Sequence, residues 1–168
     1  MYVVCGWHVA NSILIKSFED KIYITPLKLS CLVYLLYSEY LYLTGEKLFN
    51  ETFMKSSYGS PILTSIYEKF GVYGNNVIKS YAFDARGKIT YVGNETFNEC
   101  LTFVWEKFKN IPTVEVLSYL ADGKQYSRRK PGFVLSELDA LNDIITKREN
   151  ELEVAKSNVK KINFTMVT

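Results

Sequence analysis

The residues whose side chains could do chemistry are few in this sequence. His8 is the only histidine, and Cys5, Cys31 and Cys100 are the three cysteines. A lone histidine beside Trp7 in a helical stretch is typical of a structural residue, and widely spaced cysteines in apolar surroundings are typical of buried, reduced thiols. No acidic pair has metal-ligand spacing, and serine-hydrolase, phosphate-loop and dinucleotide motifs are missing. We therefore expect no catalytic residue, no metal site, no cofactor and no enzymatic activity.

The run KQYSRRK, residues 124–130, is the one local concentration of positive charge. The whole chain carries a formal charge of only +2, so a strong general attraction to nucleic acid or anionic lipid is not indicated. No recognition helix or aromatic platform accompanies the run, which favours a solvated loop over a phosphate-contacting patch at Arg128 and Arg129. Nucleic acid is therefore not the expected partner.

A long helix over residues 26–44 is predicted to hold the rest of the chain in place. Thr25 can cap it, Pro26 suits its first position, and Gly45 suits the left-handed residue after its end. Apolar residues occupy nearly every face, so other helices should surround it. The apolar run is too short for a membrane span and contains Glu39, so we expect a scaffold helix and no membrane association.

Helical spacing predicts further helices over residues 5–18, 61–70, 97–108, 113–122 and 134–158. Residues 46–60 form an irregular connector or a single helical turn in this prediction. The run 77–92 alternates β-prone residues around the turn sequence DARG, which predicts a small β-hairpin, and INFTMV at 162–167 could add a short strand. The expected fold class is mainly α (α+β): a compact helical domain around a central hydrophobic helix with a small β-hairpin.

The length and composition favour a single protein-binding domain. The chain has 168 residues without an evident linker, and 13 tyrosines and 10 phenylalanines suit core edges and protein interfaces. No secretion signal is evident at the N-terminus, so we expect a cytoplasmic protein. The sequence does not determine the oligomeric state.

The order of three motifs carries more information than any one of them. They are ITPLKLSCLVYLLYSEYLYLTGEKLF at 24–49, YGSPILTSIYEKFGVYG at 58–74 and IPTVEVLSYLADGKQYSRRKPG at 111–132. In this order they resemble the Panacea antitoxin domain, also described as the SocA-like, phage-associated family, over roughly residues 5–132. The chain resembles a divergent member, because Cys31 replaces a lysine, Ser56 replaces a tryptophan and Ser60 is inserted. The residues that carry the match include Pro26, Lys28, Tyr34, Gly45, Tyr58, Gly59, Pro61 and Tyr67.

The resemblance implies a domain that neutralises a toxin by direct protein contact and that serves against many unrelated toxins. Our first hypothesis is therefore an antitoxin with a cognate toxin as its protein partner. The alternatives are a phage or mobile-element accessory protein that binds a host or defence protein, and a DNA-binding autoregulator that uses the basic run. Capping and packing explain most of the motif residues as builders of the fold.

The end of the resemblance near residue 132 divides the chain into a Panacea-like domain, 1–132, and a C-terminal helix and tail, 133–168, packed on the same domain. We expect residues 134–168 to make a large share of the partner contacts, with Tyr81 and Phe83 as neighbours. The candidate partner-binding residues are Tyr81, Phe83, Arg128, Arg129, Leu152 and Phe164. The alternative is that the last helix completes the core through Leu138, Leu141 and Ile145.

Overall fold

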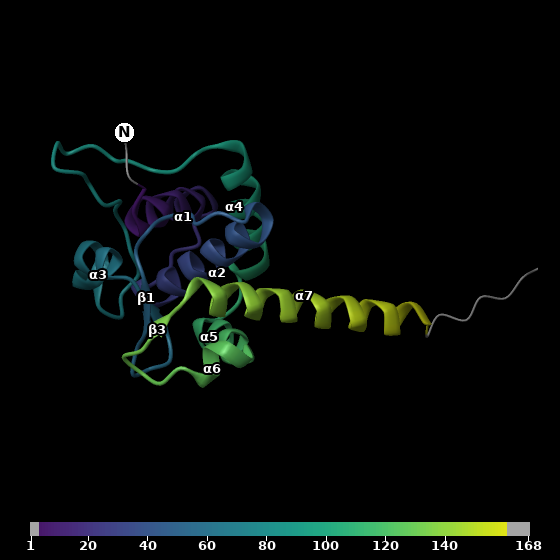
Figure 1. Cartoon of the computed structure of the whole chain (residues 1–168). Helices are drawn as coiled ribbons and strands as arrows, with labels where there is room; N and C mark the ends of the chain where they lie inside the picture. The colour runs from purple at the N-terminus through teal and green to yellow at the C-terminus, as the bar shows by residue number, and fades with distance from the viewer. Residues whose placement is uncertain (1–3, 161–168) are drawn as a thin grey trace, which may run out of the picture.

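A computed structural model describes residues 4–160 of the chain (Figure 1). The elements follow in the order α1 (Gly6–Asp20), α2 (Pro26–Thr44), β1 (Phe53–Lys55), β2 (Pro61–Ile62), α3 (Thr64–Phe70), the 3-10 helix η1 (Gly71–Tyr73), α4 (Glu95–Phe108), α5 (Thr113–Ala121), α6 (Lys124–Arg128), β3 (Val134–Leu135) and α7 (Glu137–Lys160). The predicted fold class, mainly α with a small β-hairpin, is confirmed. Within the described residues, no helix is long and apolar enough to cross a membrane.

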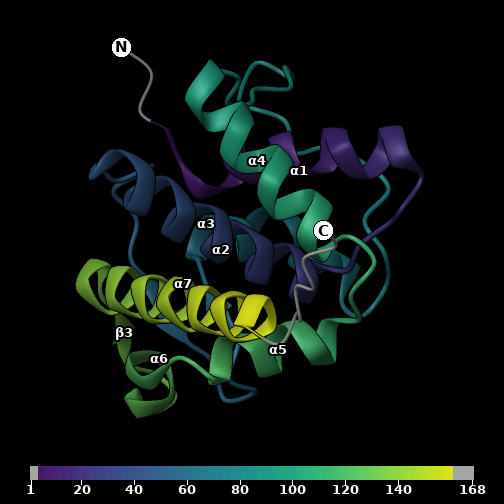
Figure 2. The same cartoon turned by 90° about the vertical axis from the view of Figure 1, so that its right-hand side faces the viewer.

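Helix α2 is the central element, as its capping pattern predicts. The Thr25 side chain accepts a hydrogen bond from the Lys28 backbone N–H, and Gly45 ends the helix at a φ of 72°. Figure 2 shows α2 in the middle, with α1 and α4 above it and α7 below it. Because neighbours lie on several sides, the helix is buried on nearly every face, including Leu29, Leu32 and Leu36.

The small sheet lies where the sequence predicts a connector. Strand β1 is central and pairs antiparallel with β2 on one side and β3 on the other, with Met54 opposite Ile62 and Val134. Gly59, at a φ of 80°, makes the turn between β1 and β2 as expected. Pro61 lies in β2, so its predicted place as the first residue of a helix is wrong. Helix α3 begins three residues later, at Thr64.

The predicted hairpin at 77–92 is wrong, because neither arm of this segment is a strand. Asn11 of α1 takes the place of a strand partner: its Nδ2 donates to the carbonyls of Ala82 and Thr90, and its Oδ1 accepts from the Ala82 N–H, all at 2.9 Å. Ser12 bonds both the N–H and the carbonyl of Val92 at 2.8 Å. The Asn11 side chain therefore lies between the two arms and takes the hydrogen bonds that they would otherwise make with each other. A tight turn remains at the tip, from Asp84 to Lys88.

Candidate protein-binding surfaces

His8 and the cysteines, which were considered for chemistry, have structural roles or are buried. The His8 Nδ1 accepts a hydrogen bond from the Cys5 backbone N–H at 2.9 Å, which closes a capping box at the start of α1. Cys31 and Cys100 are buried, and burial raises the pKa of the Cys31 thiol to about 12, so it stays protonated. Among residues 4–160, no group of three His, Cys, Asp or Glu residues could hold a metal ion.

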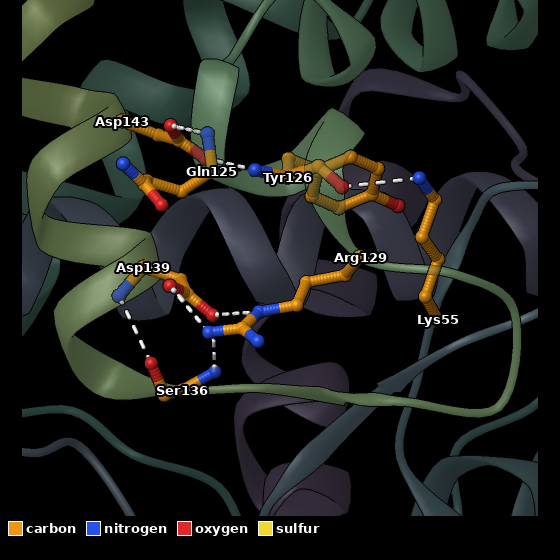
Figure 3. A network of polar contacts seen from close by, with 7 residues as sticks. All are labelled: Lys55, Gln125, Tyr126, Arg129, Ser136, Asp139 and Asp143. Atoms are coloured by element: carbon orange, nitrogen blue, oxygen red, sulfur yellow. Dashed lines mark hydrogen bonds and ion pairs between the residues drawn. The ribbon is translucent and has the colours of Figure 1, made fainter.

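A carboxylate from α7 organises the basic run. Asp143 accepts hydrogen bonds from the backbone N–H groups of Gln125 and Tyr126 at 2.9 and 2.8 Å, so it caps the start of the short helix α6 (Figure 3). A Cβ atom at Gly123 would lie 2.8 Å from the Asp143 carboxyl group, which explains the glycine there. The run predicted as a solvated loop is therefore partly helical and docked on α7.

Tyr126, in the middle of the run, is buried and bonded to the sheet region. Its hydroxyl donates to the Gly59 carbonyl, and its own carbonyl accepts from Lys55 Nζ at 3.0 Å. Burial raises the pKa of the Tyr126 hydroxyl. A residue that we did not single out in the sequence thus anchors the run, and its being the single aromatic residue in KQYSRRK is the signal that could have pointed to it.

Arg128 and Arg129 are both exposed, but Arg129 belongs to the same polar network. The Arg129 Nε lies 2.8 Å from an Asp139 carboxylate oxygen, and Ser136 and Asp139 form a capping box at the start of α7 (Figure 3). Although burial acts to raise it, the hydrogen bonds from Arg129 and Ser136 lower the pKa of Asp139. The Arg129 guanidinium is therefore part of an intramolecular ion pair, which reduces the charge this run can offer to a phosphate.

The first half of α7 is built into the domain. Arg148 Nη2 lies 2.5 Å from the Oε2 atom of Glu39 on α2, and its guanidinium carbon lies 4.5 Å from the ring centre of Phe103. Leu141 packs against the core, as the core-completing alternative predicts, whereas Leu138 is exposed, so that part of the alternative is wrong. Residues 137–148 therefore dock through apolar groups, including the buried Ala140, as well as through charged ones.

The second half of α7 leaves the body of the protein (Figure 1). Residues 149–158 are all exposed, with Leu152 exposed by 56% and Val154 by 60%. The predicted contact residue Leu152 therefore lies on a free helix surface. Phe164 and the predicted strand at 162–167 lie outside the described residues.

The segment 77–92 presents a second surface. Asn11 and Ser12 hold its backbone on α1, while the side chains of Phe83, Ile89 and Tyr91 are exposed by 48%, 40% and 60%. The sequence analysis named Phe83 as a contact residue but not Ile89 or Tyr91, which occupy alternate positions on the second arm. The exposed aromatic and aliphatic groups on a fixed backbone are typical of a protein-binding loop.

Tyr81 and two of the motif tyrosines differ in how far they are exposed. Tyr81 is half-buried, with its ring centre 4.8 Å from that of Phe18, so part of its ring packs on α1. Tyr58 and Tyr67 are exposed, and core packing therefore does not explain them. The loop and the free half of α7 lie on different sides of the molecule (Figures 1 and 2), so the predicted contact residues do not form one site.

Comparison with known proteins finds no matching family model, no matching curated protein and no matching solved structure. The resemblance to the Panacea antitoxin domain therefore rests on the sequence motifs alone. In the structure, one of these motif residues, Lys28, caps α4: its buried Nζ donates to the carbonyls of Lys109 and Ile111 at 3.0 and 2.7 Å.

Proposed function

We propose that this chain is an antitoxin that neutralises a cognate toxin by direct protein contact in the cytoplasm. The class of partner comes from the resemblance to the Panacea domain. The observation that supports protein binding is the segment 77–92, which exposes Phe83, Ile89 and Tyr91 from a backbone that α1 holds in place.

A fixed loop of this kind is well suited to bind a protein. A few buried residues, most often Trp, Tyr and Arg, contribute most of the binding free energy at protein interfaces. Since Asn11 and Ser12 already order both arms, little further conformational entropy is lost when a partner binds. Phe83 and Tyr91 are therefore the proposed anchors of the interface.

The tip of the loop adds positive charge beside these anchors. Arg86 and Lys88 are both exposed, and their backbone N–H groups donate to the Asp84 side chain at 2.8 and 2.9 Å. The turn is therefore ordered, and its two cations face solvent. They favour a partner with an acidic rim around an apolar patch, because complementary charge speeds association.

The adjacent reading frame provides the first test. We expect it to encode a protein that cannot be cloned alone but can be cloned together with this chain. If the neighbouring product is harmless by itself, and this chain rescues no toxic protein, the antitoxin proposal is wrong. A neighbour that this chain binds without any toxicity would support the accessory-protein alternative instead.

The binding surface is tested with the double variant Phe83→Ala/Tyr91→Ala. We expect it to keep the wild-type circular-dichroism melt and to lose about tenfold or more in affinity for the co-expressed partner, together with neutralisation. Tyr58→Ala, which removes an exposed tyrosine from the β1–β2 turn, is the matched control and should bind normally. A folded double variant with full affinity would assign the contact to another surface.

A further inference from the structure

The free half of α7 continues a seam that begins on the body of the protein. Leu141, Ile145, Arg148, Leu152 and Ala155 follow one another at intervals of four, three, four and three residues, which places them along one stripe of the helix. The first three face the domain: Leu141 packs against the core, Ile145 is half-buried and Arg148 pairs with Glu39. The last two continue the stripe into solvent.

The charges that flank this stripe change sign along the helix. Glu149 lies before Leu152, and Lys156 lies after Ala155, seven residues from Glu149 and therefore at the same side of the stripe. Both side chains are exposed. An acidic end followed by a basic end on one side is self-complementary when two such helices run in opposite directions.

We propose that residues 149–160 of α7 pair antiparallel with the same segment of a second copy of this chain. Leu152 of one copy then lies opposite Ala155 of the other, and the two-fold axis passes between positions 153 and 154. Glu149 lies beside Lys156 of the second copy, and symmetry repeats this ion pair on the other side. The interface is isologous, so it closes at two copies.

The existing contacts favour this direction over a parallel pair. In a parallel pair, Glu151 would face Lys156 of the second copy, but Glu151 already binds Lys107 with an N–O distance of 2.8 Å. Antiparallel pairing leaves that ion pair intact. It also opposes the two helix dipoles and keeps the two globular bodies at opposite ends of the pair.

Antiparallel pairing also covers apolar surface at the base of the free helix. In an antiparallel pair, the residue numbers of any two facing positions add up to the same value. If Leu152 faces position 155 of the second copy, position 160 therefore faces position 147. Each helix end therefore reaches the body of the other copy near Arg148, whose guanidinium lies over the rings of Phe103 and Tyr42. Both rings are partly exposed, so the interface extends beyond the helices themselves, which span about 18 Å.

The first experiment measures the oligomeric state of the full chain by sedimentation equilibrium. We expect a dimer whose dissociation constant rises about tenfold or more in Leu152→Glu and stays unchanged in Val154→Glu, because Val154 is similarly exposed but faces away from the seam. A wild-type monomer at about 100 µM would overturn the proposal. So would a Leu152→Glu dimer as tight as wild type. Both substitutions lie at exposed positions, and a circular-dichroism melt confirms folding.

The second experiment tests the direction by exchanging charges. Glu149→Lys and Lys156→Glu should each weaken the dimer several-fold, and the double variant should restore it, because the ion pair between copies is re-formed with its charges reversed. A double variant no tighter than the single ones overturns the antiparallel register. Loss of the dimer after deletion of residues 161–168 alone would assign the contact to that tail and would also overturn the proposal. The loop 77–92 lies elsewhere, so neutralisation by a dimerisation variant does not depend on this result.

Discussion

Arg148 Nη2 and Glu39 Oε2 lie 2.5 Å apart although 109 residues separate them in the sequence. Glu39 lies on the central helix α2, and its side chain is almost completely buried. The pair is the last buried ion pair that holds α7 on the domain among the described residues, since residues 149–158 are exposed and the later pair between Lys107 and Glu151 lies at the surface. The same helix is a structural element before this pair and a free surface after it.

Replacing Arg148 with Met should destabilise the protein by about 2–4 kcal/mol, because Glu39 is then left buried without its partner. Urea unfolding followed by circular dichroism measures this change. Lys47→Met is the matched control: its ion pair with Glu137 is exposed, and its loss should cost less than about 1 kcal/mol. Equal stability of Arg148→Met and wild type would show that the buried pair does not hold α7.

Lys28→Met should lower the free energy of unfolding by about 1–3 kcal/mol. The methionine keeps most of the side-chain volume but removes the ammonium group that bonds the carbonyls of Lys109 and Ile111. These two acceptors would remain at a partly buried site beyond the end of α4. Thermal melts measure the loss, with the exposed neighbour variant Leu27→Met as control. A more stable Lys28→Met protein would mean that water replaces the ammonium group at little cost.

Asn11→Ala should release the segment 77–92 while the helices stay folded. The variant loses all three hydrogen bonds from the Asn11 side chain to Ala82 and Thr90. We expect limited trypsin digestion to cut faster at Arg86 or Lys88, and stability to fall by about 1–3 kcal/mol. Ser12→Ala, which loses the bonds to Val92 only, should have a smaller effect. Unchanged cleavage of Asn11→Ala would show that the loop is held by other contacts.

Truncation after Asn150 should leave the domain folded. It removes the free part of α7 and the exposed Lys107–Glu151 ion pair, whose loss costs less than about 1 kcal/mol, but it keeps Asp139, Asp143 and Arg148. We expect a nearly normal melt, loss of the dimer, and retention of neutralisation through the loop 77–92. A truncated chain that is folded but no longer neutralises would restore the free helix as the partner-binding surface.

A shorter truncation, after Ser136, provides the control for this experiment. It removes all of α7, including the cap of α6 by Asp143 and the partner of Glu39. We expect this chain to lose its cooperative melt. If it melts like the longer truncation, α7 makes no net contribution to the stability of the domain.

Lys147 should make the stability rise with pH between about 8 and 10.5. Burial lowers the pKa of its ammonium group to about 8, whereas the unfolded chain has the ordinary value of 10.5. In this interval the unfolded state binds more protons than the native state, so the free energy of unfolding increases with pH. Relative to Lys147→Met and the permanently charged Lys147→Arg, wild type should gain roughly 1–2 kcal/mol. Parallel pH profiles of all three proteins would contradict the lowered pKa.

Local signals in the sequence determined where the main helices begin and end. Thr25, Pro26 and Gly45 mark the bounds of α2, and the helix predicted over residues 97–108 is α4, which runs from Glu95 to Phe108. The interactions involved are short-range, so residue type and spacing are enough to predict them. The exposure of Phe83 and Leu152 also agrees with their predicted place at the surface.

The tertiary structure decided which backbone groups find partners far away in the chain. The alternating run 77–92 has the composition of a hairpin, but Asn11 and Ser12, about 70–80 residues earlier, take its hydrogen bonds. The connector becomes β1 because Val134 and Leu135 return beside it. Alternation alone cannot tell which face of the segment 77–92 lies against α1. It therefore did not predict that Tyr81 is half-buried and Tyr91 exposed. Local periodicity reports that a segment has two faces, and only packing against distant elements decides which face meets water.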